Sequence, residues 1–317
     1  MWGKKYVKNV KKCIRRLIMT DRMQNFIRTD IACECIDTTK NPPDGIEYKE
    51  EKIGEIVRTY MKIISEKEAE RIGKPCGEYI TLDCGDISQL GGAESLALSS
   101  LLAKELLTAA KRLSGKDSAK ELCVLVSGLG NEHMTPDALG PRTVSALTVT
   151  GHISKLDPKL FSELGCARLY AVATGVMGDT GIESAELIRG AAQSVKPDVI
   201  IAVDALASRD LSRLCTTVQM SDSGINPGSG VKNSRKEISK RTLGVPVIAL
   251  GVPTVVDSVT LAANLLSEAG FDPEMTAKGK KTMNTCFVSP RNIDAVIESA
   301  ASVIAASIDR AFGINQG

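Results

Sequence analysis

Four short apolar segments constrain the fold of this chain more than any other feature of its sequence. They occupy residues 122–127, 169–173, 199–203 and 245–250, and Gly, Pro or Asp residues bound them. Each is apolar nearly throughout, as in strands that are covered on both faces, whereas a half-exposed strand alternates apolar and polar residues. The four segments therefore predict the strands of a parallel central sheet.

Helical patterns alternate with these segments. They cover residues 93–113, 182–195, 258–269 and 292–312. Strands that alternate with helices are typical of a doubly wound α/β fold, in which a mainly parallel sheet is flanked by helices. Residues 55–64 and 78–82 read as strands around a helix at 65–72. They predict an N-terminal β-containing extension of the sheet or a small subdomain.

The composition limits the possible partners. The net charge of +2 is too small to attract nucleic acid or an anionic membrane, and no segment approaches the roughly 20 apolar residues of a membrane span. The nine cysteines are odd in number and form no CxxC pair, so we expect reduced thiols in a cytoplasmic compartment. We expect no direct nucleic acid binding, no membrane association, no cofactor and no bound metal.

The sequence lacks the motifs of the common nucleophilic and metal hydrolases. No GxSxG elbow follows a predicted strand, and no HExxH motif occurs. The glycine pairs match neither the dinucleotide fingerprint nor the phosphate-binding P-loop. His133 and His152 are the only histidines, so a Ser or Cys triad would have to use one of them as its base. Carboxylate chemistry is what remains.

Asp137 and Asp204 are the strongest candidates, because working residues in doubly wound sheets gather at the carboxyl ends of strands. Thr135, Pro136 and Asp137 read as the N-cap, first residue and first-turn acid of a helix. Asp204 ends an apolar segment, where loss of solvent raises the pKa of a carboxyl group. Asp257 ends another such segment. Each aspartate could also serve only to cap a helix or end a strand.

Taken as a pair, Asp137 and Asp204 form a more specific pattern. A carboxylate near a helix N-terminus tends to stay ionised, while one in an apolar pocket tends to hold a proton. Such a pair supplies a base and an acid for activating water against a peptide bond. The residues therefore predict aspartic-type hydrolysis on a fold unlike that of pepsin.

Several long motifs carry a resemblance to a known family. They are GLGNEHMTPDALGP at 128–141, TGVMGDTGIES at 174–184, VDALASR at 203–209, and SDSGINPGSGVKNSRKEISK followed by TLGVPVIALGVPTVVD within 221–257. These motifs closely resemble the spore germination proteases. The resemblance implies an endopeptidase that starts the degradation of the small acid-soluble proteins that coat spore DNA. It places the catalytic aspartates of the family on Asp137 and Asp204.

The resemblance also implies the fold of the hydrogenase maturation proteases, whose GxGN loop is similar to residues 128–131. Those enzymes hold nickel with paired acids. A metal-dependent peptidase that uses Asp137, Asp204 and His133 or His152 is therefore the alternative enzyme. The alternatives in other classes are an inactive binding protein on the same fold and a phosphorylase-like enzyme that binds phosphate through Gly-rich loops.

The N-terminal region resembles a self-cleavage site. Zymogens of the family remove a short prosegment by cutting after an acidic residue that precedes Ile, Leu or Phe and then Ala. Asp30, Ile31 and Ala32 repeat that order, and Glu34 supplies the downstream acid of the substrates. The resemblance therefore implies cleavage between Asp30 and Ile31.

This cleavage site sets the expected domain organisation. Residues 1–30 form a prosegment, and residues 31–317 form a single α/β peptidase domain. Residues 1–18 carry seven Lys and Arg and no acid, unlike a usual prosegment. If translation begins at Met19 or Met23, these residues are an artefact of an incorrectly assigned start codon. The resemblance also implies a homotetramer in the cytoplasm of the forespore and the spore core.

A site that prefers acids on both sides of the cut should contain cations. A guanidinium can bind a carboxylate through two hydrogen bonds. Basic residues crowd the segment after Gly230, namely Lys232, Arg235, Lys236, Lys240 and Arg241. We expect one or more of them to bind substrate, although most such runs are solvated surface.

Overall fold

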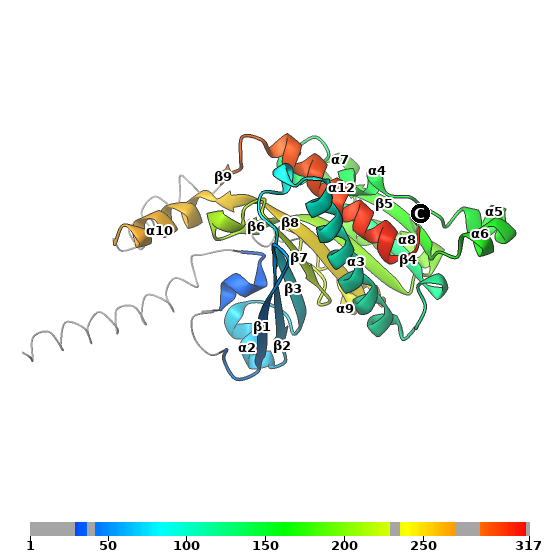
Figure 1. Ribbon diagram of the computed structural model, residues 1–317, viewed down its shortest axis with the longest axis horizontal. Helices are drawn as coiled ribbons and strands as arrows, with labels where there is room; N and C mark the ends of the chain where they lie inside the picture. Colours follow the sequence, from blue (N-terminus) through cyan, green and yellow to red (C-terminus); the bar gives the residue numbers. More distant parts are fainter. Residues whose placement is uncertain (1–28, 37–41, 229–234, 271–285, 315–317) are drawn as a thin grey trace, which may run out of the picture.

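The computed structural model describes residues 29–36, 42–228, 235–270 and 286–314. Its centre is a nine-stranded mixed sheet with the strand order β1-β2-β3-β7-β8-β6-β4-β5, and β9 pairs with β8 (Figure 1). Helices cover both faces of this sheet. Lys232 lies outside the described residues.

The four predicted apolar segments all form strands, and neighbouring members of the group β8-β6-β4-β5 are parallel. They are β4 (Cys123–Leu129), β5 (Arg168–Gly175), β6 (Val199–Ser208) and β8 (Val247–Asp257). The predicted α/β fold is thus confirmed. All four strands run past the carboxyl ends of their apolar segments. The extension is longest in β6, which continues to Ser208, and in β8, which continues to Asp257.

The N-terminal strands extend the same sheet with antiparallel pairing. They are β1 (Ile46–Ile53), β2 (Ile56–Ile63) and β3 (Gly77–Asp83), and β7 (Thr217–Ser221) joins β3 to β8. The strands predicted at 55–64 and 78–82 are present. Two further strands are not predicted from the sequence. The side chains of β1 are mostly charged and solvent-facing, and β7 spans only five residues.

Helices α3 (Gly92–Ser114) and α12 (Ile293–Ala311) lie side by side across one face of the sheet (Figure 1). Leu98, Leu102 and Leu106 of α3 follow each other at intervals of four residues and are fully buried, so they form one helix face. Burial of each contributes about 1.5–3 kcal/mol of hydrophobic stabilisation. α4 (Leu139–Ala146) covers the same face beside α12.

On the opposite face, the α-helices of the described residues lie over the two ends. α8 (Ser184–Val195) packs on the parallel strands and α2 (Glu66–Ile72) on the antiparallel ones. Between them, Ile31 and Cys33 pack against Leu206 of β6. The N-terminal segment around Ile31 and the 3-10 helix η1 (Ala32–Cys35) therefore covers the middle of this face.

The remaining elements are short or peripheral. They are η1 (Ala32–Cys35), η2 (Ile87–Gln89), η3 (Ala119–Glu121), η4 (Thr135–Asp137), α5 (Ile153–Leu156), α6 (Pro158–Leu164), α7 (Met177–Thr180), η5 (Leu211–Arg213), α9 (Lys240–Leu243), α10 (Ser258–Glu268) and β9 (Phe287–Val288). Among the helices of the described residues, none combines the length and apolar character needed to cross a membrane.

Candidate active site

Asp137 and Asp204 line a common cavity of about 340 Å³ at the carboxyl end of β4. Asp204 is 5% exposed, and it lies within β6 rather than at the strand end that the sequence suggested. The pairing of β4 with β6 stops at Gly128 and Val203. The space beside Asp204 is therefore free of β4, and the turn that carries Asp137 reaches into it.

Asp137 belongs to the 3-10 turn η4 (Thr135–Asp137). The prediction that Thr135 is a helix N-cap is wrong, since Met134 precedes the turn and α4 begins only at Leu139. Two hydrogen bonds from outside hold the turn in place. The hydroxyl of Thr254 on β8 donates to the Pro136 carbonyl at 2.7 Å, and the N–H of Asn131 donates to the Asp137 carboxylate at 2.8 Å.

Two glycines of the GLGNEHMTPDALGP motif allow this turn to sit against the strands. Gly130 has a φ of +105°, and an added Cβ would lie 2.0 Å from the Asp137 carbonyl oxygen. An added Cβ on Gly140 would lie 2.3 Å from the carbonyl oxygen of Leu129. Only glycine fits such close backbone approaches, so the motif brings Asp137 next to the end of β4.

The two aspartates differ in their affinity for a proton. Burial raises the pKa of Asp204 well above its usual value, and the charges of Asp137 and Asp30 raise it further. Burial also raises the pKa of Asp137, but less strongly. A backbone N–H, from Ala205 for Asp204 and from Asn131 for Asp137, and the charge of Arg235 lower the pKa of both groups. The pair therefore favours a proton on Asp204 and a negative charge on Asp137. Such an arrangement can remove a proton from water and return one to a leaving group.

Comparison with known proteins identifies the family of this chain. The sequence profile of the germination proteases matches residues 27–269. The chain belongs to the germination protease family. It is 36% identical over 313 residues to the germination protease of Clostridium acetobutylicum. The aligned region covers 90% of this chain and 94% of the relative.

Two other germination proteases are similar over most of the chain. Identity to the protein of Priestia megaterium is 43% over 270 residues, with 82% of this chain and 72% of the relative covered. Identity to the protein of Caldanaerobacter subterraneus is 40% over 310 residues, with 90% and 94% covered. Membership of the germination protease family makes the chain a peptidase.

The basic residues predicted to bind substrate differ in their surroundings. Arg235 lines the cavity of the two aspartates. Lys236 forms an ion pair with Glu186 at 2.6 Å, and Arg241 pairs with Glu237. Arg235 is thus the one predicted cation that the described residues place at the cavity.

The other acids and histidines considered in the sequence lie elsewhere. Asp257 ends β8, and its carboxylate accepts hydrogen bonds from the N–H and hydroxyl of Thr260 at 2.9 and 3.1 Å. His133 and His152 are exposed and do not line the cavity. Within the described part of the chain, no group of three or more His, Cys, Asp and Glu side chains is placed to hold a metal ion.

The predicted self-cleavage site of this germination protease lies next to the aspartates. Asp30 lines the same cavity as Asp137 and Asp204. The neighbouring Ile31 is fully buried. The peptide bond between Asp30 and Ile31 is thus covered by the fold, so an external protease would need local unfolding to reach it.

Sequence reasoning missed several residues that shape the site. Thr254 positions the Asp137 turn, and Gln219 and Lys74 hold the main chain around Asp30. No local signal marks them, because Gln219 lies in a short strand and Lys74 in a loop after α2. Long-range pairing of strands brings Gln219 next to Asp30, beside a second pocket that Lys74 also lines.

Proposed function

We propose that this chain is the zymogen of an endopeptidase that starts the degradation of small acid-soluble spore proteins during germination. Asp137 and Asp204 are its catalytic pair. The observation that carries this proposal is the cavity in which two carboxyl groups of unequal proton affinity lie beside Asp30, the acidic residue of the expected cut. Family membership supplies the reaction class.

The chemistry follows from the two protonation states. The ionised Asp137 accepts a proton from a water molecule, and the resulting hydroxide forms a C–O bond with the carbonyl carbon of the substrate. The protonated Asp204 then gives its proton to the amide nitrogen as the C–N bond breaks. The products are a carboxylic acid and an amine, and the proton on Asp137 restores the starting pair after exchange with solvent.

The same site is proposed to mature the chain by hydrolysis between Asp30 and Ile31. This idea is supported by the position of Asp30 in the cavity and by the order of acid, Ile and Ala that the family cuts in its substrates. A tethered segment has a high effective concentration, so self-cleavage can precede attack on a free protein. The cleaved form is then the active enzyme.

The assembly and the compartment are part of the proposal. We expect a homotetramer in the core of the forespore and the spore, as the family resemblance implies. The eight described cysteines are free thiols, which fits a reducing cytoplasm. Sedimentation of the purified protein tests the tetramer.

The test of the proposed function uses the substrate itself. The matured protein is incubated with a small acid-soluble spore protein, and mass spectrometry maps the fragments. We expect a first cut after an acidic residue and before Ile, Leu or Phe followed by Ala. An intact spore protein, or cuts with no preference for an acid, would contradict the proposal.

A further inference from the structure

The chain is extended up to Ile31 and then enters the 3-10 helix η1 (Ala32–Cys35). Groups from other elements hold its main chain over residues 29–32. Lys74 donates to the carbonyl of Thr29 at 2.9 Å. The N–H of Asp30 donates to the Ala207 carbonyl at 2.8 Å, and the Ala207 N–H donates to the Asp30 carboxylate at 2.9 Å. These contacts resemble the way in which a peptidase groove holds a substrate main chain.

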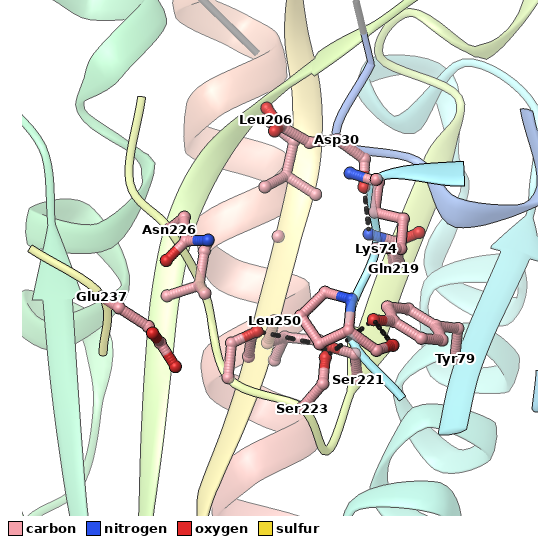
Figure 2. Close-up of a pocket in the computed structure, with 16 residues that line it drawn as sticks. Asp30, Lys74, Tyr79, Leu206, Gln219, Ser221, Ser223, Asn226, Glu237 and Leu250 are labelled. Carbon is pink, nitrogen blue, oxygen red and sulfur yellow. Dashed lines mark hydrogen bonds between the residues drawn. The ribbon is translucent and has the colours of Figure 1, made fainter. Parts of the chain in front are cut away.

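Gln219 makes the central contact of this set. Its side-chain amide donates to the Asp30 carbonyl at 2.9 Å and accepts from the Ala32 N–H at 2.6 Å. Figure 2 shows Gln219 directed at Asp30. One amide group thus spans Ile31, from the carbonyl before the expected cut to the second N–H after it. Gln219 is 7% exposed, so both bonds are shielded from water.

The register of the sheet explains why Gln219 and Asp204 both lie near the segment around Asp30. Gln219 is paired with Gly251, and Gly251 is paired with Asp204, so all three face one side of the sheet. Neighbouring strands are about 4.8 Å apart, which puts Gln219 about 10 Å from Asp204. Gly251 adds no side chain between them, and Leu206 supplies an apolar floor on which Ile31 packs.

A separate pocket holds the downstream acid. The Glu34 carboxylate accepts hydrogen bonds from the N–H groups of Arg209 and Asp210 at 2.7 and 3.1 Å, and from the Thr29 hydroxyl. The Arg213 guanidinium lies 3.9 Å away. Adjacent backbone N–H groups of this kind bind anions. The acid is thus held by the turn after β6.

We propose that Gln219 aligns the peptide for cleavage, and that with Lys74 and the N–H groups of Arg209 and Asp210 it forms a substrate-binding groove. The groove fits chains with an acid, a bulky apolar residue and alanine in succession, and a second acid two positions further on. This inference rests on the proposed function. In the zymogen residues 29–34 occupy the groove, so the new N-terminus at Ile31 must leave it before a spore protein can bind.

The chemistry of an amide suits Gln219 to this task. Its N–H₂ group holds the carbonyl oxygen that becomes negatively charged when water adds, and its oxygen holds the second N–H. Methionine has a similar length but can form neither bond, and glutamate would place a carboxylate against the carbonyl oxygen. Replacement of Gln219 should therefore slow cleavage and loosen its register.

The test follows self-cleavage of the full chain by mass spectrometry. Two changes are combined: Gln219→Met, and replacement of Ala32 by its α-hydroxy acid through nonsense suppression. The second change removes only the N–H that donates to Gln219. We expect this ester to slow formation of the Ile31 N-terminus about tenfold in the wild-type background, as for loss of one hydrogen bond. In the Gln219→Met chain the ester should not slow cleavage any further. Gln219→Met by itself should also produce cuts at neighbouring bonds.

Ser223→Ala is the matched control, because the Ser223 hydroxyl donates to the Tyr79 hydroxyl at 2.9 Å (Figure 2). It should process at the wild-type rate. If the ester slows cleavage equally in the wild-type and Gln219→Met chains, or if Gln219→Met is processed at the wild-type rate, the role of Gln219 is overturned. The proposed function is not affected by either result. If Gln219→Met fails to fold, an ester without effect in the wild-type background overturns it. A wild-type chain that neither processes itself nor cuts a spore protein would overturn the proposed function and this inference together.

Discussion

The backbone N–H of Asn131 donates a hydrogen bond to the carboxylate of Asp137 at 2.8 Å. This contact links the end of β4 to the turn that carries the first aspartate. It stabilises the charged form of Asp137, while Asp204 lies deeper and has a more strongly raised pKa. A division of labour between base and acid follows from these two environments.

The first prediction concerns the catalytic pair. Asp137→Asn or Asp204→Asn should leave the protein folded but lower peptidase activity at least a thousandfold, because Asn neither accepts the proton of water nor returns one to the amine. Cleavage of a spore protein measures activity, and circular dichroism measures folding. Asp257→Asn is the control, since Asp257 contacts Thr260 and not the cavity, and it should keep most of the activity. A folded variant of either aspartate with normal turnover would remove that residue from the mechanism.

The second prediction concerns stability and pH. Burial raises the pKa of Asp204, so the folded protein binds its proton more tightly than the unfolded chain. Asp204 contributes its full stabilisation at pH values below its pKa in the unfolded chain, which is about 4. This contribution falls as the pH rises toward the pKa in the folded protein. Asp204→Asn should remove that fall. Its urea midpoint relative to wild type should therefore rise between about pH 4 and pH 8. A constant difference over this range would show that Asp204 is not desolvated.

The third prediction separates the aspartic mechanism from the alternatives. Thiol alkylation should leave activity unchanged, because none of the eight described cysteines lines the cavity of the two aspartates. EDTA should also leave activity unchanged if the two aspartates act without a metal. Activity lost on chelation and restored by one divalent metal would favour the metal-dependent peptidase.

The fourth prediction concerns maturation. The wild-type chain should acquire an N-terminus at Ile31 with a first-order rate that does not depend on protein concentration, since the cut is made within one chain. Asp204→Asn should stay uncut. N-terminal sequencing of protein from sporulating cells gives the site. Full activity in the uncut chain, or a cut far from Ile31, would mean that the similarity to a substrate is accidental.

The fifth prediction tests the support of the Asp137 turn. Thr254→Val removes the hydrogen bond to the Pro136 carbonyl, and it should cost about 1 kcal/mol of stability. Because the turn then shifts, kcat should fall severalfold with little change in KM. Thr260→Val also loses a buried hydroxyl, the one bonded to Asp257. It should lower stability to a similar extent and leave kcat unchanged. Equal kinetic effects in the two variants would refute a positioning role for Thr254.

The local pattern of the sequence was enough to predict the parallel half of the sheet and most long helices. Continuous apolar segments occur where a strand is buried on both faces. A stretch of a few residues is enough to show this pattern. The strands β1 and β7 are not predicted, because neither carries a long continuous apolar segment. β1 is largely exposed and β7 is short, so their presence depends on partners distant in the sequence.

The sequence also pointed to Asp137 and Asp204, through their places after predicted strands and through the family resemblance. It misjudged their local setting, because Asp204 lies inside β6 and the Asp137 turn is not the start of α4. Both errors have one cause. The end of β4 at Leu129 opens the space that the turn fills, and the length of a neighbouring strand cannot be read from either aspartate.

Only the tertiary structure decided which residues surround the expected cut. Lys236 and Arg241 are paired with acids, while Arg235 faces the aspartates. Gln219 reaches Asp30 because β7 pairs with β8 in a register that aligns Gln219 with Gly251. Strand register is fixed by long-range hydrogen bonding and by which face is buried. The sequence alone therefore determined the fold class and indicated the two candidate acids, and the three-dimensional pairing determined which residues surround Asp30 beside them.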